Sequence, residues 1–145
     1  MEKLYQYSSA RINSINLSFK RYLWDRINWK KRLIVLSGAR GTGKTTLLLQ
    51  YIKENLKDPG TVMYASLDDL YFSTCTIVDF ADDFVKRGGK YLFLDGIHKY
   101  RNWSQEINNI YDYFSDLHIV ATGSSALNVF QGTADLGHGK CIYCC

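Results

Sequence analysis

Short apolar runs alternate along this chain with segments in which apolar residues recur at helical spacing. Four runs have the length and composition of buried strands: Leu33–Leu36, Thr61–Ala65, Tyr91–Leu94 and Leu117–Ala121. Apolar residues recur at helical spacing in three segments: after Lys44, over about Thr76–Arg87, and over Ile107–Phe114. Because strands that alternate with helices form parallel sheets covered by helices, the pattern predicts an α/β fold.

A separate helical pattern precedes the first strand. Its apolar residues would share one helical face: Ile12, Ile15, Phe19, Tyr22, Leu23 and Ile27. A basic turn, Lys30-Lys31-Arg32, then leads into the strand. We therefore expect an N-terminal helical extension over residues 1–31, an incomplete core over residues 32–136, and an atypical cysteine-containing tail over residues 137–145.

The composition agrees with one small domain that can bury a core. The chain has 145 residues, of which 46% are hydrophobic and 22% are charged. The net charge is +4, but a solvated turn explains the run of basic residues at 30–32 better than nucleic-acid binding does. No apolar run approaches the ~18 residues of a membrane span, and the N-terminus lacks the apolar region of a signal peptide. We expect a cytoplasmic protein without membrane contact.

The segment between the first strand and the next helix fits the phosphate-loop pattern G-x-x-x-x-G-K-[ST] at every fixed position. It reads Gly38-Ala39-Arg40-Gly41-Thr42-Gly43-Lys44-Thr45, and Thr46 follows. The glycines let backbone N–H groups turn inward around phosphates, Lys44 reaches the terminal phosphates, and the Thr45 hydroxyl can ligate Mg²⁺. The helix that begins near Lys44 would point the positive end of its dipole at the phosphates. Residues 38–46 are therefore predicted to bind a nucleoside triphosphate.

A carboxylate at the end of another strand would complete this site. Asp95 follows the apolar run Tyr91–Leu94, and we expect it to hold Mg²⁺ through water beside Thr45. Gly96 comes next, at a position where many ATPases of this layout have a glutamate that polarises the attacking water. His98, Asp68 and Asp69 could take that role, although a loop histidine and capping or turn aspartates are the simpler interpretations.

The fourth strand ends in small hydroxyl residues, Thr122-Gly123-Ser124-Ser125. Thr122 and Ser124 have the character of a sensor for the γ-phosphate, and the alternative is a polar turn. In parallel α/β sheets, ligands bind beyond the carboxyl ends of the strands. We therefore expect the phosphate loop, Asp95 and the Thr122 region to converge on one site.

These motifs together resemble one family. Residues 94–103 read L-D-G-I-H-K-Y-R-N-W, which is similar to the L-D-E-I-x-K-x-P-x-W usual in prokaryotic ATPases of the AAA_14 type, often followed by a DUF4143 segment. The resemblance implies a P-loop NTPase fold of the AAA-like kind, a three-layer αβα sandwich with a mostly parallel sheet. It also implies ATP and Mg²⁺ as cofactors, with Lys44, Thr122 and Ser124 acting in catalysis.

The resemblance has two departures that bear on function. Gly96 replaces the expected glutamate, so hydrolysis is expected to be weak or absent. After residue 136 the expected arginines and fifth strand are missing, so we expect a truncated sheet that exposes Leu33–Leu36 as an edge for a second copy or a protein partner. The leading hypothesis is a Mg-ATP-binding AAA-type core. The alternatives are a non-enzymatic ATP-dependent switch module and a non-functional fragment of a longer ATPase.

Overall fold

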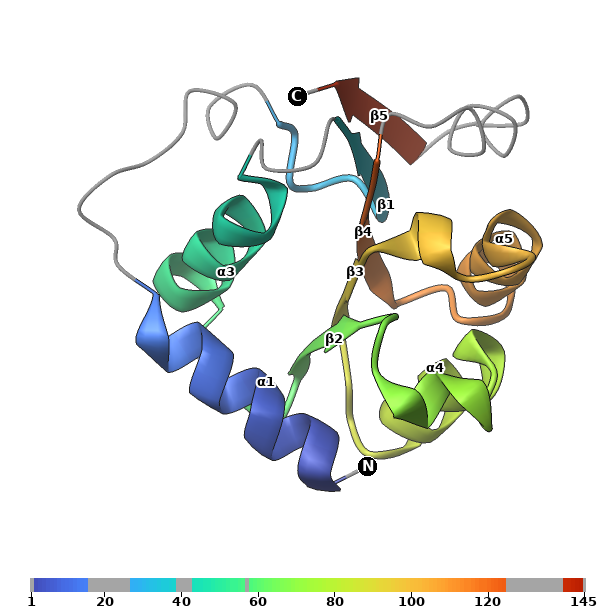
Figure 1. Ribbon diagram of the computed structural model, residues 1–145, viewed down its shortest axis with the longest axis horizontal. Coiled ribbons are helices and arrows are strands. Elements are labelled where there is room, and N and C mark those ends of the chain that lie inside the picture. Colours follow the sequence, from blue (N-terminus) through green and yellow to red (C-terminus); the bar gives the residue numbers. More distant parts are fainter. Residues whose placement is uncertain (1, 16–26, 39–42, 57, 125–139, 145) are drawn as a thin grey trace.

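The computed structural model describes residues 2–15, 27–38, 43–56, 58–124 and 140–144. Its elements follow the predicted alternation of strands and helices (Figure 1). They are α1 (Glu2–Ser14), β1 (Leu33–Ser37), α3 (Lys44–Asn55), β2 (Val62–Ser66), the 3₁₀ helix η1 (Leu70–Ser73), α4 (Ile77–Lys86), β3 (Tyr91–Asp95), the 3₁₀ helix η2 (Ile97–Lys99), α5 (Trp103–Tyr113), β4 (His118–Gly123) and β5 (Lys140–Cys144).

All strands of the sheet run parallel, in the order β2-β3-β4-β1-β5. The register aligns their carboxyl ends, because Asp95 lies opposite Ser66 on one side and opposite Thr122 on the other. Ser37, the last residue of β1, lies opposite Gly123 of β4. The end of β1, which leads into the phosphate loop, and the end of β3, which carries Asp95, are thus brought to one edge of the sheet.

Helices cover both faces of this sheet. Figure 1 shows α4 and α5 on one side and α3 on the other. Alternate strand residues divide between two buried clusters: Leu92 and Leu94 of β3 pack with the α4 and α5 residues, whereas Phe93 packs with the α3 residues. Strands buried on both faces read as continuous apolar runs, which is the pattern seen in the sequence. The predicted three-layer αβα sandwich is confirmed.

Helix α1 covers the outer edge of β2. Leu4 near its start belongs to the cluster on the α4 side, and Ile12 near its end packs against the cluster on the α3 side. The predicted helix continues through Phe19, Tyr22 and Leu23, which lie outside the described residues. No helix in the described part of the chain is long and apolar enough to cross a membrane. The predicted boundary at residues 31 and 32 stays a prediction.

The expectation that the sheet lacks a fifth strand is wrong. Residues 140–144, assigned to an atypical tail, form β5, which pairs with β1 over the full length of that strand. Leu33–Leu36 therefore lie between β4 and β5 and do not form an edge. The error has a physical cause. Ile142 and Tyr143 favour strands, but the segment is only five residues long, and whether it forms a strand depends on pairing with β1, which is distant in sequence.

Candidate nucleotide-binding site

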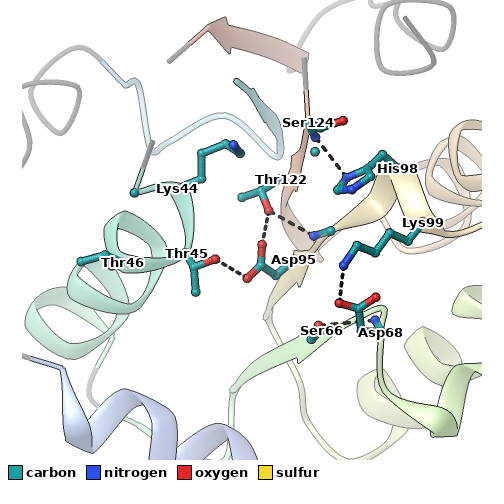
Figure 2. Close-up of a pocket in the computed structure, with 13 residues that line it drawn as sticks. Lys44, Thr45, Thr46, Ser66, Asp68, Asp95, His98, Lys99, Thr122 and Ser124 are labelled. Carbon is teal, nitrogen blue, oxygen red and sulfur yellow. Dashed lines mark hydrogen bonds and ion pairs between the residues drawn. The ribbon is translucent and has the colours of Figure 1, made fainter. Parts of the chain in front are cut away.

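A pocket of about 520 Å³ opens at the carboxyl ends of the strands. Its walls come from the start of α3, the ends of β2, β3 and β4, and η2 (Figure 2). Every described residue of the predicted site except Gly38 lines it: Gly43, Lys44, Thr45, Thr46, Asp95, Thr122 and Ser124. Gly38 is buried behind them, where its N–H donates to the Gly123 carbonyl at 3.3 Å. Ala39, Arg40, Gly41 and Thr42 lie outside the described residues.

The N-terminus of α3 opens directly onto this pocket. Gly43 caps the helix with a φ of 86°, a conformation that glycine adopts without steric cost. The first N–H groups of a helix have no partners within it, so they form a site for an anion. Lys44 Nζ donates to the Gly38 carbonyl at 2.7 Å, which keeps the ammonium group beside the loop. The chemistry of this end of α3 suits phosphate oxygens.

Three hydroxyl groups hold the Asp95 carboxylate. Thr45 Oγ1 donates to Asp95 Oδ2 at 2.5 Å, Tyr64 OH donates to the same oxygen at 2.6 Å, and Thr122 Oγ1 donates to Oδ1. Thr122, which is fully buried, also accepts a hydrogen bond from the Gly96 N–H at 3.2 Å. The carboxylate is therefore oriented from α3, β2 and β4 at once.

Tyr64, which contacts Asp95, is a residue that the sequence does not identify as part of the site. Burial, reinforced by the charge of Asp95, raises the pKa of Tyr64, so its phenol stays protonated and donates at neutral pH. A signal was present in the sequence, because Tyr64 stands one residue before the end of the predicted strand Thr61–Ala65, close to the edge where the site was expected. Without the register to β3, however, nothing connects that tyrosine with Asp95.

The oxygen atoms around Asp95 are suitable ligands for a magnesium ion. The Thr45 hydroxyl and the Asp95 carboxylate are hard oxygen ligands, and their oxygens lie within one hydrogen bond of each other. Mg²⁺ in nucleotide sites is held by one or two such groups, together with water and phosphate. Thr45 and Asp95 would hold the ion, which would neutralise phosphate charge next to Lys44.

The opposite wall of the pocket is formed by η2 and the end of β4. His98 Nδ1 accepts a hydrogen bond from the Ser124 N–H at 3.0 Å. Burial, with a further contribution from the charge of Lys99, lowers the pKa of His98, which keeps the imidazole neutral and able to accept. Lys99 pairs with Asp68 at 2.5 Å between exposed side chains (Figure 2). His98 thus lines the site, whereas the simpler interpretation had placed it on a loop.

The aspartates that follow β2 have structural partners. Asp69 caps η1 by accepting the Tyr71 N–H at 2.9 Å, as the simpler interpretation predicts. Asp68 lies at the pocket but is paired with Lys99. Among the described residues that line the pocket, Asp68 and Asp95 are the only carboxylates. Gly96 contributes none, and its φ of 77° places it in the left-handed region.

Comparison with known proteins identifies the family. A sequence model of the AAA_14 family, described as an AAA domain, matches residues 30–144. The chain belongs to this family. The match includes β5, so the AAA_14 pattern extends through the residues that the sequence analysis assigned to an atypical tail.

Relatives of this AAA_14 domain include an uncharacterized protein of Methanocaldococcus jannaschii, MJ1637. The two are 40% identical over 111 residues, which cover 70% of this chain and 23% of the relative. The chain therefore spans less than a quarter of the length of that protein.

Two solved structures share the fold of the domain. AMPPCP-bound DnaA from Aquifex aeolicus is similar with a TM-score of 0.51 and 20% identity over 92% of this chain and 42% of that chain. PCH-2 from C. elegans is similar with a TM-score of 0.50 and 18% identity over 98% of this chain and 41% of that chain. The domain thus has the fold of AAA-type P-loop ATPases.

Proposed function

We propose that this domain binds Mg-ATP in the pocket at the carboxyl ends of its strands. The proposal rests above all on the convergence of Lys44 and Thr45, at the start of α3, with Asp95, at the end of β3, around one pocket. Backbone N–H groups of residues 38–46 would surround the phosphates, and Lys44 would contact the terminal ones. The preference for adenine follows from membership of the ATPase family.

We expect ATP hydrolysis by this chain to be weak. A side chain that takes a proton or orients water contributes typically 10²–10⁴-fold to a rate, and Gly96 supplies none. Thr122 and Ser124 would act as sensors of the γ-phosphate, Thr122 through Asp95 and Gly96, and Ser124 through His98. The neutral His98 could orient water, but its Nδ1 is already engaged by the Ser124 N–H.

A non-enzymatic switch is the second candidate, and Gly96 favours it. In such a module, nucleotide occupancy would change the arrangement of η2 and the end of β4, which are joined by the His98–Ser124 hydrogen bond. Single-turnover measurements with labelled ATP separate the candidates. Hydrolysis that Lys44→Ala removes supports the ATPase, and Mg-ATP binding without turnover supports the switch.

The binding site itself is tested by Lys44→Ala. The substitution removes a charge-assisted contact with phosphate, so ATP affinity should fall about tenfold or more. Calorimetry with Mg-ATP measures this change. Lys86→Ala is a suitable control, because Lys86 is an exposed lysine on α4 that pairs with Asp82 at 2.7 Å, remote from the pocket. Equal ATP binding by wild type and Lys44→Ala would contradict the proposed site.

A further inference from the structure

A chain of contacts connects the N-terminal helix with the metal-binding carboxylate. Ser8 of α1, which is buried, accepts the Tyr64 N–H at 2.9 Å through its hydroxyl oxygen. The guanidinium group of Arg11, one turn later, lies 5.9 Å from the centre of the Tyr64 ring. At the other end of the same side chain, Tyr64 OH donates to Asp95 Oδ2. Tyr64 therefore contacts α1 with its backbone and ring, and Asp95 with its hydroxyl.

The hydroxyl of Tyr64 has a role that packing does not explain. The ring is 5% exposed and belongs to the apolar cluster on the α3 side, where a phenylalanine ring would fill the same space. A hydroxyl in such a place needs a partner, because a buried polar group without one is costly. Its partner here is the carboxylate expected to bind the metal, which lies at the edge of the nucleotide pocket.

The hydrogen bonds at Asp95 indicate what Tyr64 would do when a metal binds. A carboxylate offers about four lone-pair positions, and Thr45, Tyr64 and Thr122 use three of them. If Thr45 turns its oxygen to Mg²⁺, Tyr64 still holds Oδ2 and Thr122 still holds Oδ1. The carboxylate then keeps its orientation, and each oxygen retains room for a water ligand of the ion.

The position of α1 extends this effect to the N-terminal helix. A second pocket of about 240 Å³ lies between α1 and the metal site, and Tyr7, Arg11, Thr45, Tyr64 and Asp95 are among its lining residues. The β2 side of Asp95 thus borders a space that α1 closes. Because Ser8 accepts the Tyr64 N–H, a shift of α1 would also move the backbone of Tyr64, which β2–β3 pairing places beside Asp95.

We propose that Tyr64 is a positioning residue for Asp95, seated by α1, and that the N-terminal helix thereby sets the Mg²⁺ dependence of nucleotide binding. The inference rests on the proposed function of the pocket. It assigns α1 a part in nucleotide binding beyond covering the edge of the sheet.

The test is a Mg²⁺ titration of the binding of a fluorescent ATP analogue to the full chain. Tyr64→Phe keeps the ring and removes the hydroxyl, so the Mg²⁺ concentration at half-maximal binding should rise about two- to tenfold, the effect of one hydrogen bond. Nucleotide affinity in EDTA should not change. Tyr91→Phe is the matched control, because Tyr91 is the first residue of β3, whereas Asp95 is its last.

Electron paramagnetic resonance of Mn²⁺ in the nucleotide complex gives a second readout, and the bound-ion spectrum should change in Tyr64→Phe only.

The part played by α1 is tested with Ser8→Ala. This substitution should also raise the required Mg²⁺ concentration, and the rise should vanish in the Tyr64→Phe background. An unchanged Mg²⁺ midpoint in Tyr64→Phe, with ATP binding that still depends on Lys44, would overturn the role of Tyr64 and leave the proposed function intact. Equal rises caused by Ser8→Ala in both backgrounds would overturn the route through Tyr64. Absence of nucleotide binding by the wild-type chain would overturn both proposals.

Discussion

Gly96 determines much of what this site can do chemically. Its φ of 77° and ψ of 40° lie in the left-handed region, and the Gly96 N–H donates to Thr122 Oγ1. A Cβ atom built at this position would meet only the Lys99 side chain, at 4.0 Å, so there is space for a side chain. The backbone is the obstacle, because residues other than glycine lose roughly 1–2 kcal/mol in this conformation. A glutamate here would have to bear that strain or change the local backbone.

We predict that Gly96→Glu raises single-turnover ATP hydrolysis and lowers the free energy of unfolding by about 1–2 kcal/mol. Gly96→Ala carries the same backbone strain without the carboxylate, so it should show the loss of stability and no gain in rate. The two variants and the wild type are compared by labelled-ATP turnover and by urea unfolding. Equal rates in Gly96→Glu and Gly96→Ala would mean that Gly96 does not occupy the catalytic position.

His118 gives the fold a dependence on pH. Its Nδ1 atom is buried without a hydrogen-bond partner in the described part of the protein, and its ring lies 5.1 Å from that of Tyr91. Burial, followed by the positive charge of Arg32, lowers the pKa of His118 below the ordinary value of 6.5. The unfolded chain therefore binds the proton more readily than the folded chain does.

This difference predicts that stability falls with acidification. The contribution of His118 is complete above pH 6.5 and is lost as the pH falls from there through the lower folded pKa. His98, whose pKa is also lowered, acts in the same direction. In urea unfolding at pH 7 and pH 5, the His118→Gln variant should lose less unfolding free energy between the two pH values than the wild type loses. Equal losses would assign the pH dependence to other groups.

At the scale of single elements, local chemistry sets the boundaries that the sequence predicts. Thr76 begins α4 by accepting the Asp79 N–H at 3.1 Å, and Asp69 begins η1 in the same way. The turn before β2 is closed at Asp58, whose Oδ1 atom accepts the Gly60 N–H at 3.1 Å. Such signals need only a few neighbouring residues, so they can be read without knowledge of the fold.

Features that depend on pairing between distant elements could not be predicted in the same way. The contact between Tyr64 and Asp95 joins residues 31 positions apart and exists because Tyr64 and Phe93 are register partners. The sequence leaves His98 open as a candidate for the catalytic role or a loop histidine, because its hydrogen bond to Ser124 depends on the ends of β3 and β4 being adjacent. The residue types of the phosphate loop and Asp95 were readable from the chain, whereas the groups that orient them required the sheet.

For the whole molecule, the decisive feature is how the two edges of the sheet are covered. Helix α1 lies over β2 at one edge, and β5 pairs with β1 at the other. All residues of β1 are buried, so this strand would present apolar side chains and unpaired backbone groups if β5 were absent. The sequence predicts that β1 would be an exposed edge strand prone to pairing with another chain, but it does not predict β5, which covers that edge.

We therefore predict that β5 keeps this chain from self-association. A chain that ends at residue 136, and an Ile142→Pro variant that removes a backbone N–H in the middle of β5 at the residue opposite Val35, should form larger species than the full chain at equal concentration. Ile142→Val keeps the N–H and serves as the control, and light scattering coupled to size-exclusion chromatography measures the mass of each. If the proline variant stays as small as the valine variant while remaining folded by circular dichroism, another segment covers β1. Because the phosphate loop continues directly from β1, we also expect weaker Mg-ATP binding in both disrupted chains, which would show that the fifth strand supports the nucleotide site as well as the solubility of the fold.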